Sequence, residues 1–233
     1  MIPITVSQPD GLYIPTSATL AQLYEDEPLR DFAAGLLHTA VLQTCNLQPA
    51  TCNLLLAQAL HHPGPEFYPL LTALLALDAE VRATVGNETR VLPLPGFLSY
   101  RASLPPDKAP LQAVRLPPLN LGGHYRFFGI FLGDEHGAVR FDLHPALRVA
   151  GHMRLALSGP TRFPMRLIPI EERLDRQALT EALIEAAVAV GGEEVSPPPA
   201  SLEQSRVSAN AQFAGFQTIK LTTRSKWLSA VAM

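Results

Sequence analysis

The sequence is poor in cysteine and in charge, and it has no long apolar run. Only two of its 233 residues are cysteines, too few for a disulfide framework. Charged residues make up 17% of the chain and the net charge is −3, which argues against a dedicated nucleic-acid-binding protein. No apolar stretch has membrane-spanning length, and the residues after Met1 lack the basic segment and apolar core of a signal peptide. We therefore expect a cytoplasmic protein with no membrane span.

Common signatures of catalysis and metal binding are missing as well. There is no Walker loop, no Gly-x-Gly-x-x-Gly and no Gly-x-Ser-x-Gly. Cys45 and Cys52 are spaced as Cys-x6-Cys, which fits neither a redox dithiol nor a zinc knuckle, so we expect buried free thiols. The seven histidines are not clustered with acidic or cysteine ligands. Residue types alone therefore identify no catalytic residue and no metal ligand.

What the chain does contain is typical of a globular protein. Hydrophobic residues make up 47% of it, which excludes wholesale disorder, and 22 prolines favour short elements over a long helical bundle. The low content of charged residues suggests that a partner covers part of the surface.

Apolar periodicity predicts both helices and strands in the first half of the chain. Period-two alternation favours strands within residues 2–16, 79–83, 91–94 and 112–116, with turns at Asp10-Gly11 and Gly86-Asn87. A 3.6-residue period favours a helix from Pro28 to Val41, and residues 70–77 are apolar nearly all round, as in a buried helix.

The second half shows strand candidates followed by helices. Residues 127–132, 139–143, 147–149 and 153–157 predict an antiparallel sheet, and a helix capped by Asp175 is expected over 174–190. A proline- and glycine-rich stretch at 117–123 marks a boundary, so we assign domains to residues 1–118 and 119–233. The predicted fold class is α+β.

Several segments, in order, resemble the FAD-binding medium subunit of molybdenum hydroxylases, the carbon monoxide dehydrogenase and xanthine dehydrogenase family. The chain segments that carry the resemblance in the first half are 14–23 (IPTSATLAQL), 74–81 (LLALDAEV), 90–97 (RVLPLPGF), 104–107 (LPPD) and 114–117 (VRLP). The resemblance continues in 154–166 (RLALSGPTRFPMR), in the helical segment 171–190 and in 205–209 (SRVSA).

The resemblance implies the second α/β subdomain of a PCMH-type FAD-binding domain over residues 1–118, lacking the first subdomain. A C-terminal domain of antiparallel sheet plus helices, like that of the carbon monoxide dehydrogenase flavoprotein, would follow over 119–233. The first subdomain of the family carries a glycine-rich pyrophosphate loop, and this chain resembles the family only beyond that point.

The second pyrophosphate loop of the family, QIRNxATxGGN, corresponds to residues 43–53 (QTCNLQPATCN). Ala50, Thr51 and Asn53 match it, but both glycines are replaced, and Cys52 stands in a shortened loop. Glycine lets a backbone amide approach a phosphate closely, and a β-carbon crowds that approach. We therefore expect weak FAD binding at most in the isolated chain.

The family resemblance places the cofactor contacts by segment position. It implies that Thr51 and Asn53 lie at the FAD phosphates and that Glu66 and Tyr68 lie near the ribose or ring. An alternative is that these four residues only pack within the protein.

Two functions follow from the resemblance. In the first, the chain passes electrons between iron–sulfur clusters and an acceptor through FAD, as an oxidoreductase component that is not active alone. In the second, it is a degenerate, non-catalytic structural subunit that has lost FAD. Both imply an iron–sulfur small subunit and a molybdopterin large subunit as partners, which would hold those cofactors, or self-association.

Overall fold

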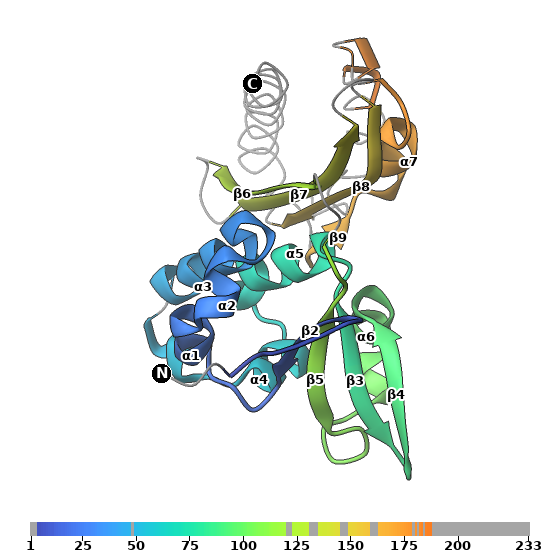
Figure 1. The fold of residues 1–233 in the computed structure, drawn as a ribbon. Coiled ribbons are helices and arrows are strands. Elements are labelled where there is room, and N and C mark those ends of the chain that lie inside the picture. The colour runs from blue at the N-terminus through green and yellow to red at the C-terminus, as the bar shows by residue number, and fades with distance from the viewer. Residues whose placement is uncertain are drawn as a thin grey trace, which may run out of the picture.

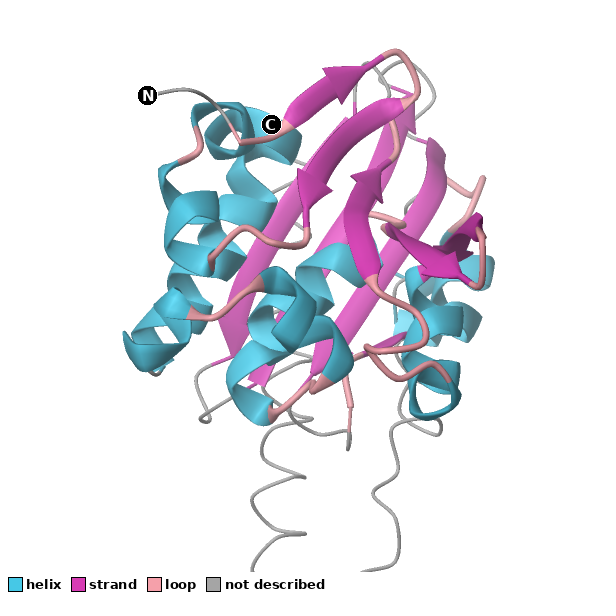
Figure 2. Ribbon diagram, turned by 90° about the horizontal axis from the view of Figure 1, so that it is seen from below, coloured by secondary structure: helices cyan, strands magenta, loops and turns pink. Residues whose placement is uncertain are grey.

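The computed structural model describes residues 4–47, 49–119, 123–130, 135–144, 149–158, 163–178, 180, 182–183 and 185–187. These residues form two antiparallel sheets with helices between and around them (Figures 1 and 2). The α+β class predicted from the sequence is confirmed.

The first sheet has five strands in the order β1-β2-β5-β3-β4, and every neighbouring pair is antiparallel. Its strands are β1 (Val6–Gln8), β2 (Gly11–Pro15), β3 (Glu80–Val85), β4 (Glu88–Pro93) and β5 (Leu111–Leu116). All of the strands expected in this half are therefore present. Gly11, with φ +142°, lies where a β-carbon would collide with the Leu116 carbonyl oxygen, so the β1–β2 turn requires glycine.

Most of the helices of the first half lie together on one side of this sheet (Figure 1). They are α1 (Leu20–Glu25), α2 (Glu27–Asp31), α3 (Leu36–Leu47), α4 (Leu56–His61), α5 (Tyr68–Ala76) and α6 (Leu94–Tyr100). Short 3-10 turns connect them: η1 (Phe32–Gly35), η2 (Pro49–Asn53), η3 (Pro65–Phe67) and η4 (Arg101–Ser103). Thr19 begins α1 with a capping box, in which its hydroxyl accepts from the Gln22 N–H.

The single helix expected from Pro28 to Val41 is wrong, because the structure breaks it at η1. Ala33 and Ala34 have φ of 53° and 51°, and Gly35 has φ of 74°. Three consecutive residues in the left-handed region cannot continue a right-handed helix, so α2 and α3 are separate. Apolar periodicity continues across the break because both helices face the same core.

The helix expected at 70–77 is confirmed as α5, and its burial has a clear cause. From Pro69 to Ala76 every residue of α5 is buried. One side of α5 packs in the core formed by the first sheet and its helices, and the other contacts the second sheet through β7 and β8 (Figure 1). Ala156 of β8 joins the same core cluster as Leu74 of α5, so one apolar core spans both halves of the chain.

The second sheet comprises β6 (Gly123–Ile130), β7 (Glu135–His144), β8 (Val149–Ser158) and β9 (Met165–Arg166), antiparallel and in chain order. The antiparallel sheet predicted here is confirmed. However, Val149, at the end of the candidate 147–149, and the candidate 153–157 belong to one strand, β8; residues 147 and 148 lie outside the described part of the chain. Gly151 suggested a turn between them, but the ladder only shifts register there, and His152 takes a positive φ of 49°.

The helix boundary expected at 174–190 is also wrong. A short helix, α7 (Ile168–Leu174), ends where the longer one was expected to begin. Asp175 is extended, and its carboxylate accepts from the Met153 N–H at 3.2 Å instead of capping a helix. Helical structure resumes at residues 182–183 and 185–187, with the Thr180 hydroxyl accepting from the Leu183 N–H. Residues 188–233 lie outside the described part of the chain.

His61, at the end of α4, predicts a pH dependence of stability. Its ring meets the Phe97 ring edge-on at 5.6 Å, and burial, together with the neighbouring charge of His62, lowers the pKa of His61 below its usual 6.5. The folded protein then binds this proton less readily than the unfolded chain. The contribution of the neutral His61 ring to the free energy of unfolding is therefore fully present above about pH 6.5, and it is lost as the pH falls toward the pKa of the folded protein.

The measurement is the melting temperature between about pH 7.5 and about pH 5, where His61→Gln should show a shallower decrease than the parent chain. The matched variant His62→Gln changes an exposed neighbour and keeps the half-buried ring of His61. Equal slopes for His61→Gln and the parent chain would show that the buried ring does not control this transition.

Candidate functional site

The segment expected to contact phosphates, residues 43–53, folds as the end of α3 and the turn η2. The chain enters η2 at Pro49 and leaves it at Asn53. Among residues 49–57 none has a positive φ. A phosphate cradle built of backbone N–H groups commonly uses such positions, so this turn does not have the form of the glycine loop that it replaces.

Cys45 and Cys52 form a disulfide across this segment, with their Cα atoms 5.1 Å apart. The prediction of free thiols is therefore wrong. Cys45 lies in the last turn of α3 and Cys52 lies in η2, which follows it. The turn from α3 into η2 brings these two residues together, although the spacing Cys-x6-Cys matches no known redox or zinc motif. The disulfide fixes the segment between them against the end of α3.

Thr51 lies inside this cross-linked turn and is buried, at 2% exposure. Its hydroxyl donates to the Thr44 carbonyl oxygen at 3.1 Å, and the Thr44 hydroxyl in turn donates to the Ala40 carbonyl oxygen at 2.9 Å. Thr51 therefore extends the hydrogen bonding of α3. A phosphate would have to compete with the Thr44 carbonyl for this hydroxyl.

Asn53 ends the turn with an exposed side chain. The chain after it pairs with the segment before α1: the Leu20 N–H donates to the Leu54 carbonyl at 3.1 Å and the Leu56 N–H to the Ala18 carbonyl at 2.9 Å. These bonds anchor η2 to the start of the domain. Of the two residues expected at the phosphates, Asn53 is the one whose side chain faces solvent.

Glu66 and Tyr68 lie in a different connection, between α4 and α5. Glu66 belongs to η3, and its half-buried carboxylate lies over Gly64, where a β-carbon would collide with it. Tyr68 is the first residue of α5. The structure thus places Thr51 and Asn53 in the turn η2, Glu66 in the turn η3, and Tyr68 at the start of α5. Both turns contact α3.

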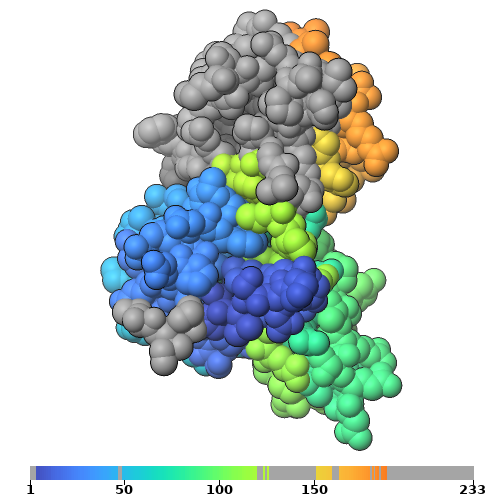
Figure 3. Space-filling model, in the orientation of Figure 1, coloured from blue at the N-terminus to red at the C-terminus, as the bar shows by residue number. Residues whose placement is uncertain are grey.

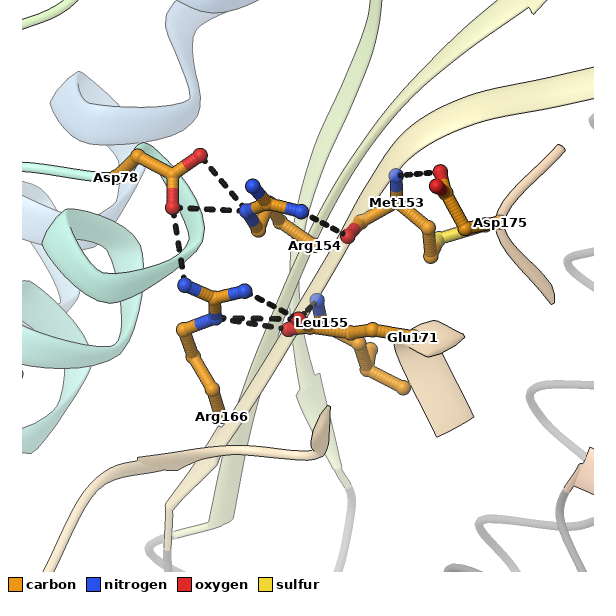
Figure 4. Close-up of polar contacts among 7 residues, drawn as sticks. All are labelled: Asp78, Met153, Arg154, Leu155, Arg166, Glu171 and Asp175. Atoms are coloured by element: carbon orange, nitrogen blue, oxygen red, sulfur yellow. Dashed lines mark hydrogen bonds and ion pairs between the residues drawn. The ribbon is translucent and has the colours of Figure 1, made fainter. Parts of the chain in front are cut away.

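A charged network links the two halves of the chain (Figure 4). Asp78, with φ of 53° at the end of α5, accepts from Arg154 Nε at 2.7 Å and from an Arg166 terminal nitrogen at 3.0 Å. Arg166 Nε also donates to Glu171 at 3.0 Å, and another Glu171 contact is made by its second terminal nitrogen. Glu171 further accepts from the Leu155 N–H at 2.8 Å.

In this network Asp78, just after α5, contacts Arg154 of β8 and Arg166 of β9 (Figure 4), and residue types alone did not identify it. Desolvation acts to lower the pKa of Arg166, but its bonds to Glu171 and the charge of Asp78 outweigh that and raise it. The side chain of Glu171 is only 5% exposed. In the sequence, the feature that could have pointed to these residues is the family resemblance, because Asp78, Arg154, Arg166 and Glu171 all lie in segments that carry it. We assign the network a structural role in holding the second sheet on α5.

A second polar cluster lies on the exposed face of the first sheet. The Tyr13 hydroxyl donates to an Asp10 carboxylate oxygen at 2.6 Å, Arg115 Nε donates to Glu80 at 2.7 Å, and Arg82 lies over the Tyr13 ring. The hydrogen bond lowers the pKa of Asp10 and raises the pKa of Tyr13. Near neutral pH Asp10 is therefore ionised and Tyr13 protonated, so neither is poised to exchange protons.

Within the described ranges, no three His, Cys, Asp or Glu side chains gather closely enough to hold a metal ion. In the same part of the chain, no helix has the length and apolar character needed to cross a membrane.

Comparison with known proteins gives a match of fold. No protein-family model and no curated protein sequence matches the chain. A carbon monoxide dehydrogenase from Hydrogenophaga pseudoflava, lacking the Mo-pyranopterin moiety of its molybdenum cofactor, is similar over 94% of this chain and 76% of that chain, with a TM-score of 0.75 and 16% identity.

Two further solved structures show the same likeness. Quinoline 2-oxidoreductase from Pseudomonas putida 86 is 14% identical over 95% of this chain and 78% of that chain, with a TM-score of 0.69. Reconstituted CO dehydrogenase from Oligotropha carboxidovorans is 16% identical over 91% of this chain and 73% of that chain, with a TM-score of 0.67. The matched chains are the medium, FAD-binding subunits, so the family resemblance noted in the sequence is confirmed as a likeness of fold.

Proposed function

We propose that this chain is a subunit of a molybdenum hydroxylase-type oxidoreductase complex and takes the position of the FAD-binding subunit. The observation that carries the proposal is a likeness of fold over 94% of the chain. The likeness spans both sheets and the helices between them, so it covers more than a common supersecondary motif. An iron–sulfur subunit and a molybdopterin subunit are the expected partners, and those cofactors belong to them.

If FAD binds, Thr51 and Asn53 are the proposed contacts at its phosphates, and Glu66 and Tyr68 are those near the ribose or ring. Bound FAD would supply the redox chemistry by which such a subunit passes electrons. These residues fit the FAD phosphates incompletely, because the Thr51 hydroxyl already donates to the Thr44 carbonyl oxygen and the turn η2 contains no glycine. The exposed carboxamide of Asn53 could contact a phosphate there, but among the described residues of this segment no cradle of backbone N–H groups surrounds it.

The geometry of η2 favours the second function, a structural subunit that docks in the complex without holding FAD by itself. The disulfide fixes η2 against α3, and the buried Thr51 contributes to helix hydrogen bonding. Such a subunit needs the fold and its docking surfaces but no phosphate loop. We therefore propose that the chain alone binds FAD weakly or not at all.

The test is a visible absorption spectrum of the purified full chain after incubation with excess FAD and removal of the unbound flavin. The expected spectrum has no flavin bands. Retained bands would contradict the structural-subunit proposal and support a working FAD site in the chain.

The place in a complex is tested separately, by purifying the tagged chain from its native host and identifying co-purifying subunits by mass spectrometry. Iron–sulfur and molybdopterin subunits are expected in stoichiometric amounts. Their absence would overturn the proposal, whatever the flavin content. A spectrum of the intact complex then shows whether a partner completes the flavin site.

A further inference from the structure

Among the strands that the structure describes, β4 is an edge strand of the first sheet with no neighbour on its outer side. It lies outermost in the order β1-β2-β5-β3-β4, and the β3–β4 hairpin projects from the rest of the molecule (Figures 1 and 3). The side chains of Glu88 and Arg90 are 73% and 60% exposed, and Val91 is 48% exposed. Such an edge leaves backbone donors and acceptors without a strand partner and can receive another strand.

The register of the hairpin shows which backbone groups point outward. Gly86, with φ of +64°, begins a two-residue turn that pairs Val85 with Glu88. In a two-residue hairpin this closing pair is hydrogen bonded, so Glu88 and Arg90 direct their backbone groups toward β3. Thr89 and Val91 then direct theirs away from the sheet.

The charges along this edge are complementary to their own reversed copy. We propose that two copies of this chain pair through β4, antiparallel, about a two-fold axis at Thr89. Thr89 then faces Thr89 of the other copy as a hydrogen-bonded pair, and Glu88 of each copy faces Arg90 of the other as closely spaced non-hydrogen-bonded pairs. Glu88 and Arg90 of one copy already form an exposed ion pair at 3.2 Å, and in this pairing each also lies opposite the opposite charge of the other copy, which stabilises the pairing.

The same charges disfavour other registers. An axis at Glu88 sets glutamate opposite glutamate, and an axis at Arg90 sets arginine opposite arginine; like charges directly opposite destabilise a strand pair. Charged residues on an exposed edge ordinarily prevent pairing with passing strands. Here they favour one partner, a second copy, in the register centred on Thr89, because an axis at Val91 would leave Glu88 and Arg90 without an opposite charge across the pair. The contact is small, so we expect a weak dimer that forms at high protein concentration.

Sedimentation of the full chain over a concentration series tests this with charge variants. Glu88→Arg and Arg90→Glu alone each replace two attractive pairs with two repulsive ones, so each should weaken dimerisation about tenfold or more. The double variant Glu88→Arg/Arg90→Glu restores opposite charges and should recover the parent affinity. A chain that stays monomeric throughout, or a dimer insensitive to the single changes, would overturn the proposal.

A cross-link fixes the register. Thr89→Cys places two cysteines with Cα atoms about 5.5 Å apart across the axis, within the range of a disulfide of about 4.4–6.8 Å. A disulfide-linked dimer is expected under oxidising conditions. Val91→Cys is the matched control, because Val91 faces Asn87 of the other copy and its cysteine has no counterpart opposite. Equal cross-linking of both variants, or a dimer with no Thr89→Cys cross-link, would show that the copies associate elsewhere. Neither outcome depends on FAD.

Discussion

Replacing Arg166 by methionine is expected to lower the free energy of unfolding by about 3 kcal/mol, measured by urea denaturation followed by circular dichroism. The Arg166 guanidinium donates to Glu171 through Nε at 3.0 Å and through one terminal nitrogen, and it donates to Asp78 at 3.0 Å through the other. Without it, the Glu171 carboxylate stays buried at 5% side-chain exposure with no opposing charge. A buried unpaired charge is far more costly than a lost surface ion pair.

Two variants test this reasoning. Arg176→Met removes an arginine that is 82% exposed and 3.7 Å from Asp175, so its effect should stay within about 0.5 kcal/mol. Arg166→Met/Glu171→Gln removes the buried charge but keeps a carbonyl oxygen to accept from the Leu155 N–H. This double variant should recover a large part of the loss. Equal stabilities of Arg166→Met and Arg176→Met would contradict the role of the network.

The sequence located the segments of this network but not the meeting of their charges. Asp78 lies in one stretch that resembles the family, and Arg154 and Arg166 lie in another. In the sequence, residues 78 and 166 are separated by all the elements from β3 to β8. Hydrophobic periodicity reports which face of an element is buried, whereas the meeting of distant charges depends on how elements pack. The long-range ion pairs therefore required the structure.

Local elements were predicted where a single strong pattern was present. The alternation on both sides of Gly86-Asn87 gave the β3–β4 hairpin, and the apolar run at 70–77 gave α5. Errors arose where a residue's usual preference was overridden. Gly151 suggested a turn but lies within β8, and Asp175 suggested a helix cap but binds the Met153 N–H.

At the candidate site, the sequence identified the replaced glycines but assigned the cysteines wrongly. Spacing rules for Cys-x6-Cys describe metal knuckles and dithiol motifs, and neither includes a helix followed by a 3-10 turn. The turn after α3 is what brings Cys45 and Cys52 together. The location of Thr51 inside that turn, bonded to Thr44, likewise depends on the fold.

Loss of the disulfide is expected to lower the free energy of unfolding by about 2 kcal/mol, because the cross-link restricts the unfolded chain over a sequence separation of seven residues. Cys52→Ser measured by urea denaturation gives this value, and reduction of the parent chain should reproduce it. The variant Cys45→Ser/Cys52→Ser is the control, since a reductant should not change its stability. A stability of Cys52→Ser equal to that of the oxidised parent would show that the cross-link contributes nothing.

A comparison of glycine and serine at position 52 tests whether residues 43–53 are the phosphate loop. Cys52→Gly and Cys52→Ser both remove the disulfide and free η2 from α3, but only glycine also permits the close backbone approach that a pyrophosphate requires. If residues 43–53 correspond to the phosphate loop of the family, FAD should bind Cys52→Gly more tightly than Cys52→Ser, as measured by fluorescence titration of the flavin. Equal affinities would reject the assignment of the loop, because both variants lack the disulfide and only glycine lacks the β-carbon that crowds the phosphate. A gain with Cys52→Gly would show that a substituted glycine limits FAD binding in a fold that otherwise retains the site.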